Sequence, residues 1–141
     1  MTDRPPKPQN EAPSWPHIPP FQQHLGIETM EAKDGRSLLR FDFRPEHGNR
    51  KGDVHGGILA TLVDIAMSQA IRSLRPELRG SSTISITVNY LETASGQILA
   101  RGKAIRVGGS IAVAEATCEA EDGRVLVHAT GSFRMIRHKE A

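Results

Sequence analysis

One stretch constrains the fold more than any other: residues 55–72, His-Gly-Gly-Ile-Leu-Ala-Thr-Leu-Val-Asp-Ile-Ala-Met-Ser-Gln-Ala-Ile-Arg. Between the two ends of this stretch, Asp64 is the only ionisable residue. The pattern predicts a helix over 57–73, ended by Pro76 and Gly80. Such a helix is apolar around most of its circumference and has to be covered on most sides. The rest of the chain is therefore expected to wrap around it.

The remaining elements have the composition of strands. They are expected over 27–33, 37–43, 83–91, 98–107, 110–121 and 125–136. The first two flank Asp34-Gly35, a dipeptide typical of tight hairpins. Short connections between the last four predict an antiparallel meander. The sequence thus predicts an α+β fold in which a curved antiparallel sheet wraps around one central apolar helix.

Two of these strands carry more detailed expectations. In 83–91, apolar and polar residues alternate strictly, which predicts that Ile84, Ile86, Val88 and Tyr90 share one face. In 110–121, alternate positions hold only small side chains, which would let a neighbouring element come close. These small residues are Ala112, Ala114, Ala116, Cys118 and Ala120.

Length and composition favour one domain with a flexible leader. The chain has 141 residues, and seven of its nine prolines fall within 1–20. Because proline removes backbone donors and favours extended chain, a leader is expected over 1–20 and one folded domain over 21–137. A short helix is expected over 21–25, at the start of that domain.

Charge and hydropathy exclude two kinds of partner. The formal charge is +2 and the basic residues are scattered, so no nucleic-acid partner is expected. No uninterrupted apolar run reaches the roughly 18 residues that cross a bilayer, and the N-terminus lacks the apolar segment of a signal peptide. The sequence therefore predicts no membrane partner and a cytoplasmic location.

Several chemistries are disfavoured by missing motifs. The six histidines show no metal-ligand spacing such as HExxH, and neither a GxSxG elbow nor a P-loop occurs. The single cysteine, Cys118, provides neither a disulfide framework nor a thiolate metal site. No metal and no cofactor are expected.

Asp64 is the leading candidate for chemistry. Its neighbours at 62–63 and 65–66 are all aliphatic, and a buried carboxylate is costly unless it is used. In such a site an aspartate acts as a general base or as a nucleophile. The alternative is an ordinary carboxylate on an exposed helix face.

The residues before the helix suggest a place for a carbonyl oxygen. Free amides at a helix N-terminus carry partial positive charge, which gives Gly56 and Gly57 a role as oxyanion donors beyond forming a tight turn. Asn49 could donate a second hydrogen bond to the same oxygen, or be a turn residue only. His55 either takes part in catalysis or only shapes the loop. The segment 106–110 either binds an anionic group or is a plain strand-turn-strand connection.

Together these residues carry a family resemblance. Asn49-x5-His55-Gly56-Gly57-x6-Asp64 resembles the signature of hotdog-fold acyl-CoA thioesterases, in particular the PaaI-like branch of the phenylacetate pathway. The segments 82–91, 106–108 and 122–133 add to the similarity, which covers about residues 20–137. The expected element order, with the helix after two strands, also matches the hotdog fold.

The resemblance implies hydrolysis of an acyl-CoA thioester to a free acid and CoA, with CoA as part of the substrate. In that family the amide at Gly56 and the side chain at Asn49 polarise the thioester carbonyl. The carboxylate at Asp64 comes from the opposite subunit and activates water or attacks directly. Thr83 occupies the place of a Ser or Thr that helps to hold the water.

The resemblance further implies how CoA is bound and how the chains assemble. Arg106, Gly108 and Ser110 match the region that lines the CoA channel, and Gly57 lies beside the thioester. The acyl pocket is expected to be shaped by variable residues such as Met67, Ser68 and Ile71. The implied assembly is a homodimer, or a tetramer of two dimers, with sites at the dimer interface.

Two other functions are compatible with the same fold. One is a non-catalytic acyl-CoA-binding protein, and the other is a hotdog hydratase or dehydratase. The complete set of Asn49, Gly56 and Asp64 argues against the first, and the loop lacks the proline pattern of the second. The predicted function is therefore an acyl-CoA thioesterase acting on a short- or medium-chain or aromatic acyl group.

Overall fold

The computed structural model describes residues 18–138, so most of the expected leader, residues 1–17, lies outside it. The elements are α1 (Pro20–Leu25), β1 (Glu28–Lys33), β2 (Arg36–Asp42), the 3-10 turn η1 (Pro45–His47), α2 (Gly56–Leu74), β3 (Gly80–Tyr90), β4 (Gln97–Val107), β5 (Ile111–Ala120) and β6 (Val125–Ile136). Pro20 is the first residue of α1, so this short helix begins one residue before the expected range of 21–25.

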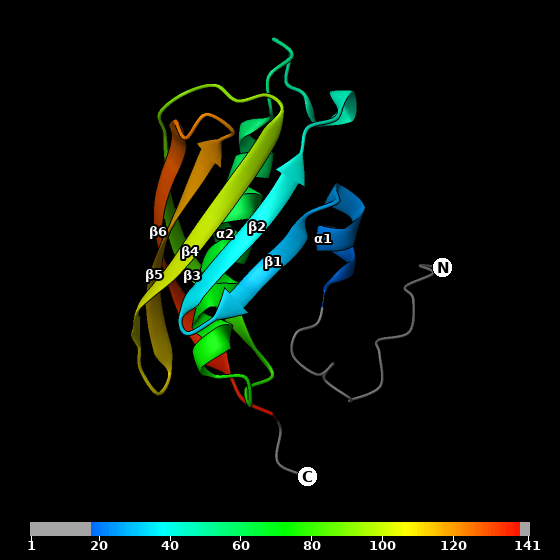
Figure 1. The fold of residues 1–141 in the computed structure, drawn as a ribbon. Coiled ribbons are helices and arrows are strands. Elements are labelled where there is room, and N and C mark those ends of the chain that lie inside the picture. The colour runs from blue at the N-terminus through cyan, green and yellow to red at the C-terminus, as the bar shows by residue number, and fades with distance from the viewer. Residues whose placement is uncertain (1–17, 139–141) are drawn as a thin grey trace, which may run out of the picture.

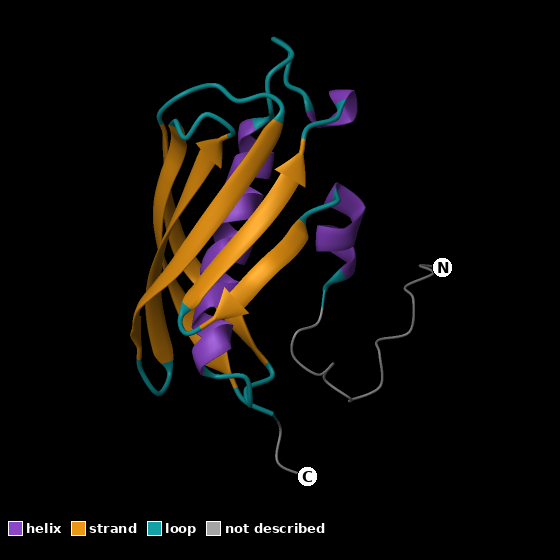
Figure 2. Ribbon diagram, in the orientation of Figure 1, coloured by secondary structure: helices purple, strands orange, loops and turns teal. Residues whose placement is uncertain are grey.

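One long helix lies against a curved sheet of six antiparallel strands (Figures 1 and 2). The strand order is β1-β2-β4-β5-β6-β3, with α2 on the concave side of the sheet. This is the α+β architecture predicted from the sequence, a sheet wrapped around one apolar helix.

The predicted four-strand meander is wrong for β3. Hairpins join β4, β5 and β6, but β3 pairs with β6 at the far edge of the sheet. The connection over 91–96 passes across the ends of two strands to reach β4 (Figure 1). Six residues of extended chain span about 20 Å, which is enough for this crossing. Connection length alone therefore does not distinguish it from a hairpin.

The core lies between α2 and the sheet. The predicted small-residue face of β5 is confirmed, because all five of its side chains are buried toward the helix. The closest approach is at Gly102 of β4, where an added Cβ would collide with the carbonyl oxygen of Ala66. The hydroxyl of Ser37 donates to that same oxygen at 2.6 Å. Small residues on the sheet thus set how deeply α2 is seated.

Length and average composition alone would allow α2 to cross a membrane. No uninterrupted apolar run marks this property in the sequence, because polar residues are spaced along the helix. In the fold, several of its large apolar side chains, among them Leu62, Val63 and Met67, are fully buried. The hydropathy of α2 is explained by its place in the core.

Candidate active site

A β-bulge in β3 decides which of its side chains face α2. Pairing with β6 shifts register between Thr83 and Ser85. Ile86 and Val88 pack against the core as predicted, but Ile84 is 53% exposed and does not share their face. The extra residue instead turns Thr83 toward the helix. Bulges often redirect side chains beside functional sites.

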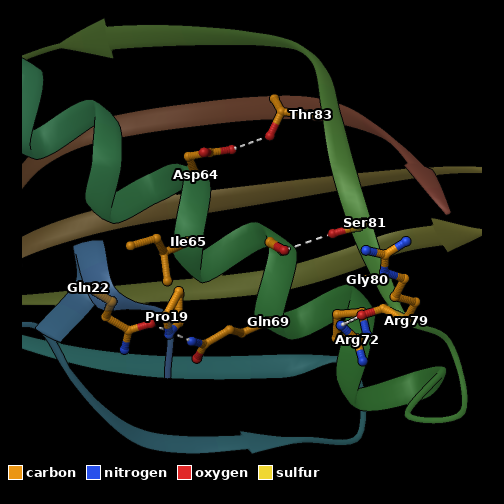
Figure 3. Close-up of a pocket in the computed structure, with 11 residues that line it drawn as sticks. Pro19, Gln22, Asp64, Ile65, Gln69, Arg72, Arg79, Gly80, Ser81 and Thr83 are labelled. Carbon is orange, nitrogen blue, oxygen red and sulfur yellow. Dashed lines mark hydrogen bonds between the residues drawn. The ribbon is translucent and has the colours of Figure 1, made fainter. Parts of the chain in front are cut away.

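Asp64 and Thr83 meet across the gap between α2 and β3 (Figure 3). The Thr83 hydroxyl donates to Asp64 Oδ1 at 2.7 Å, while Oδ2 makes no hydrogen bond to another described residue. Asp64 is half-buried, which corrects the expectation of a buried carboxylate. Its aliphatic neighbours Leu62 and Val63 turn into the core, but residue 64 lies on the helix face that the sheet leaves open.

This pair borders a cavity of about 360 Å³ between α1, α2 and the start of β3. Ser68 lines the cavity, as expected for an acyl pocket. Met67 and Ile71 do not line it, because both are fully buried against the sheet. The role of those two residues in an acyl pocket stays a prediction.

A closed ring of three hydrogen bonds holds one end of the cavity. Gln22 Nε2 donates to Thr29 Oγ1 at 2.9 Å, and Thr29 Oγ1 donates to Gln69 Oε1 at 2.9 Å. Gln69 Nε2 donates to Gln22 Oε1 at 3.1 Å, which closes the ring, and both glutamines are buried. Because a satisfied buried network is rigid, this ring fixes α1 and β1 against α2.

The other end of the cavity is basic. The hydroxyls of Ser68 and Ser81 lie 2.7 Å apart. Arg72 donates from Nη2 to the Leu78 carbonyl at 2.6 Å and from Nη1 to the Arg79 carbonyl at 3.2 Å. Burial lowers the pKa of the Arg72 guanidinium. The side chain of Arg79 makes no hydrogen bond or ion pair with residues 18–138.

The loop before α2 is held by a buried histidine that the sequence did not single out. The ring of His47 packs on Phe41 with centroids 4.9 Å apart, and its Nδ1 accepts from the Arg44 amide at 3.1 Å. The His47 carbonyl accepts from the His55 amide at 2.9 Å. His47 thus ties both ends of the loop together. Only its place in a polar loop was visible in the sequence, and that gave no sign of burial.

Asn49 has a structural role and a free donor group at once. Its Oδ1 accepts from the amides of Lys51 at 2.9 Å and Asp53 at 3.1 Å. Its side-chain NH₂ donates to none of the described residues. The turn function and the donor function, weighed above as alternatives, are therefore compatible.

His55 is the N-cap of α2 and determines which amide stays free. Its Nδ1 accepts from the Gly57 amide at 2.9 Å. The Gly56 amide lies on the first helical residue, where the helix itself supplies no acceptor. Of the two roles considered for His55, the geometry supports shaping the loop, and Gly56 rather than Gly57 is the available donor.

Tyr90 is a site residue that the sequence analysis missed. Its hydroxyl donates to the Gly56 carbonyl at 2.9 Å, and a Cβ on Gly56 would lie 3.3 Å from its ring. The strand pattern placed Tyr90 on one face with Ile86 and Val88 but gave no sign of this contact. Tyr90 therefore holds the start of α2 from the end of β3.

One chain keeps its two groups of candidate residues apart. Gly56 and Asp64 are eight residues apart on α2, which corresponds to about 12 Å. A donor to a carbonyl oxygen and a base at the carbonyl carbon must both lie within roughly 3.5 Å of their targets. The two groups of one chain therefore cannot serve the same thioester. No three possible metal ligands gather anywhere in residues 18–138.

The residues matched to a CoA channel lie elsewhere in the chain. Arg106 is exposed near the end of β4, and Gly108 and Ser110 form the β4–β5 hairpin. This hairpin is at the opposite end of the sheet from the loop before α2 (Figure 1). The Gly108 amide donates to the Ile111 carbonyl at 2.9 Å, as in a plain strand-turn-strand connection. Within one chain, none of the three lines the cavity beside Asp64.

Comparison with known proteins agrees with this architecture. Residues 51–127 match the family model described as the thioesterase superfamily. A candidate esterase of Halobacterium salinarum is 39% identical over 125 residues, which cover 80% of this chain and 82% of that protein.

Solved structures show the same fold. A thioesterase family protein from Silicibacter pomeroyi has a TM-score of 0.79 at 26% identity, covering 84% of this chain and 90% of that one. The E. coli PaaI protein from the phenylacetic acid degradation operon has a TM-score of 0.78 at 18% identity, covering 84% and 86%. That last likeness concerns the fold alone. From the family match and the identity to its relative, the chain belongs to the thioesterase superfamily and has the hotdog fold.

Proposed function

We propose that this protein is an acyl-CoA thioesterase that hydrolyses a short- or medium-chain or aromatic acyl-CoA. The observation that carries the proposal is a pair of donor and acceptor groups without partners among the described residues. One is Oδ2 of the Asp64 carboxylate, which the Thr83 hydroxyl holds at a cavity through Oδ1. The other is the loop before α2, which leaves the Gly56 amide and the Asn49 side-chain NH₂ as donors. Membership of the thioesterase superfamily supports hydrolysis as the reaction class.

The loop half-site supplies the oxyanion donors. The Gly56 amide and the Asn49 side-chain NH₂ donate to the thioester carbonyl oxygen, and the α2 dipole adds positive potential there. Negative charge grows on that oxygen as the carbonyl carbon becomes tetrahedral. These donors thus stabilise the transition state more than the substrate. His55 and Tyr90 position this half-site.

The Asp64 half-site supplies the attacking group. Asp64 either takes a proton from a water that attacks the carbonyl carbon or attacks that carbon itself. In both routes the carbon–sulfur bond breaks, and CoA leaves as a thiol once protonated. In the second route a mixed anhydride forms on Asp64, and water then hydrolyses it to the free acid and the regenerated carboxylate. Thr83 fixes one carboxylate oxygen and leaves the other for the water or the substrate.

A second copy of the chain would join the two half-sites. β3 is an 11-residue edge strand, and long open edges favour pairing with another strand. In antiparallel pairing of β3 with its own copy, the Tyr90 end of one strand approaches the Thr83 segment of the other. The loop of one subunit would then lie beside Asp64 of the partner subunit. The resulting homodimer has two sites, and two such dimers could form a tetramer.

The direct test is thiol release from aliphatic and aromatic acyl-CoAs by the wild type and Asp64→Asn. We expect the variant to lose at least about 10³-fold in kcat with unchanged folding. Asp42→Asn, the same change on β2, is the matched control and should keep full activity. Full turnover by Asp64→Asn would contradict the role of Asp64. Tight acyl-CoA binding without thiol release by the wild type would indicate a binding protein, and enoyl-CoA hydration would indicate a hydratase.

A further inference from the structure

We infer that the cavity beside Asp64 selects acyl groups whose far end carries a carboxylate, as in the monothioesters of five- or six-carbon dicarboxylic acids. The inference rests on the proposed function, because it places the thioester carbonyl next to Asp64. It is carried by three residue pairs that follow one another along the gap between α2 and β3 (Figure 3).

The three pairs change in chemistry from acidic to basic. The first is Asp64 with Thr83, and the second is the pair of serine hydroxyls, Ser68 and Ser81. In the third, Arg72 donates to the backbone carbonyl of Arg79, and both of these arginines line the cavity. A substrate lying along the gap therefore meets an anion, then hydroxyls, then cations.

The spacing of the pairs sets the length of the acyl group. Positions 64, 68 and 72 lie one turn apart on α2, a total of about 12 Å. Positions 81 and 83 alternate along β3 and position 79 lies in the bend just before it, a total of at most about 13 Å. Contact distances of about 3 Å at each end leave roughly 6 Å between the thioester carbon and the terminal group. An extended five- or six-carbon diacid spans this length, given its C–C bonds of about 1.5 Å.

Charge favours a carboxylate over a methyl group at the far end. Glu77, the acid nearest these arginines in the sequence, pairs with Arg75 and also acts electrostatically on Arg72, so Arg79 is the cation that remains for the acyl group. Guanidinium–carboxylate hydrogen bonds are among the stronger ones in proteins. An aliphatic end would displace water from the arginines without replacing its hydrogen bonds.

The test compares glutaryl and pentanoyl thioesters, which have equal carbon counts and differ at the far end. Each is assayed for thiol release by the full chain, both as the CoA ester and as the N-acetylcysteamine ester, which carries no phosphate. We expect kcat/KM for glutaryl to exceed that for pentanoyl by about tenfold or more on both carriers. Arg79→Gln should remove most of this preference by lowering the glutaryl value alone. Arg101→Gln, on the outer face of the sheet, is the matched control and should change kcat/KM for neither the glutaryl nor the pentanoyl ester.

Three outcomes would overturn the inference. One is a wild type that prefers pentanoyl. Another is that Arg79→Gln lowers kcat/KM equally for glutaryl and pentanoyl, and only for the CoA esters. Arg79 would then bind the phosphates of CoA. In both cases pentanoyl hydrolysis would leave the thioesterase function intact. No thiol release from any of the four esters would overturn the function and the inference together.

Discussion

The Asn49 side chain uses one polar atom within the protein and leaves the other for a substrate. The other candidate residues show the same division. The side-chain carbonyl oxygen of Asn49 closes the loop by accepting two backbone amides, which leaves its NH₂ for a substrate oxygen. His55 occupies the Gly57 amide and so leaves the Gly56 amide free. Thr83 occupies one oxygen of Asp64 and leaves the other. Each reactive group is therefore oriented before a substrate arrives, as a preorganised site requires.

Asn49→Asp separates the two tasks of this residue. The carboxylate keeps an oxygen for the Lys51 and Asp53 amides but has no NH₂ to donate. We expect kcat to fall by about 10²-fold, in the range for loss of one oxyanion donor, while the thermal midpoint stays near that of the wild type. Asn49→Ala should lower both. An Asn49→Asp enzyme with wild-type kcat would contradict the donor role.

Tyr90→Phe tests whether the hydrogen bond to the Gly56 carbonyl positions the start of α2. The phenyl ring keeps its packing on Gly56, and only the 2.9 Å hydrogen bond is lost. We expect kcat to fall about three- to tenfold with little change in KM, because the misplaced amide matters most in the transition state. A change in KM alone would assign Tyr90 to substrate binding instead.

At the scale of elements, the bulge in β3 and the close seating of α2 build the site. The pairing of β3 with β6 shifts register near Ile84. This pairing and its shift bring three residues to the cavity: Arg79, Ser81 and Thr83. The sequence predicted the helix and the strands well, since their hydrophobic periods are clear. It did not predict the bulge, because no glycine or other break marks Ile84 in a regular alternation. It misplaced β3, because a six-residue connection fits both a hairpin and a crossing.

Gly102→Ala tests the seating of α2 on the sheet. The new methyl group would collide with the Ala66 carbonyl and the Ser37 hydroxyl, and backbone atoms there cannot move aside cheaply. We expect the free energy of unfolding in urea to fall by about 2–3 kcal/mol. Gly109→Ala is the matched control, because nothing lies within 4 Å of its added Cβ. Equal stability of the two variants would show that α2 is less tightly seated than described.

At the scale of the whole molecule, the site residues come from segments that only the complete fold brings together. The motif in the sequence identified Asn49, Gly56 and Asp64, whose spacing is local. Tyr90 and Arg79 escaped notice because one ends β3 and the other lies just before its start, and their surroundings depend on strand pairing far along the chain. The fold also explains why one chain has two half-sites, since α2 holds Gly56 and Asp64 apart.

Cys118 reports on the integrity of the whole core. Burial raises the pKa of its thiol from 9.0 to about 12. Between those values the unfolded chain releases a proton that the native state keeps, so the free energy of unfolding should fall as pH rises from about 9 to 12. At about pH 8 we expect negligible alkylation of Cys118 in the native protein and rapid alkylation in urea. Mass spectrometry measures the alkylated fraction over time. If Cys118 were alkylated as fast in the native protein as in urea, this result would contradict its burial in a closed core.

The central claim is that each site combines the loop of one subunit with Asp64 of the other, and complementation between inactive variants tests it. Asp64→Asn and Asn49→Asp chains, separately tagged, are mixed under conditions that exchange subunits, and thiol release is measured. Random pairing makes half of the dimers mixed, each with one intact site of two, so activity should return to about a quarter of the wild-type value. Sites contained within single chains would give no recovery at all, and that result would contradict the account.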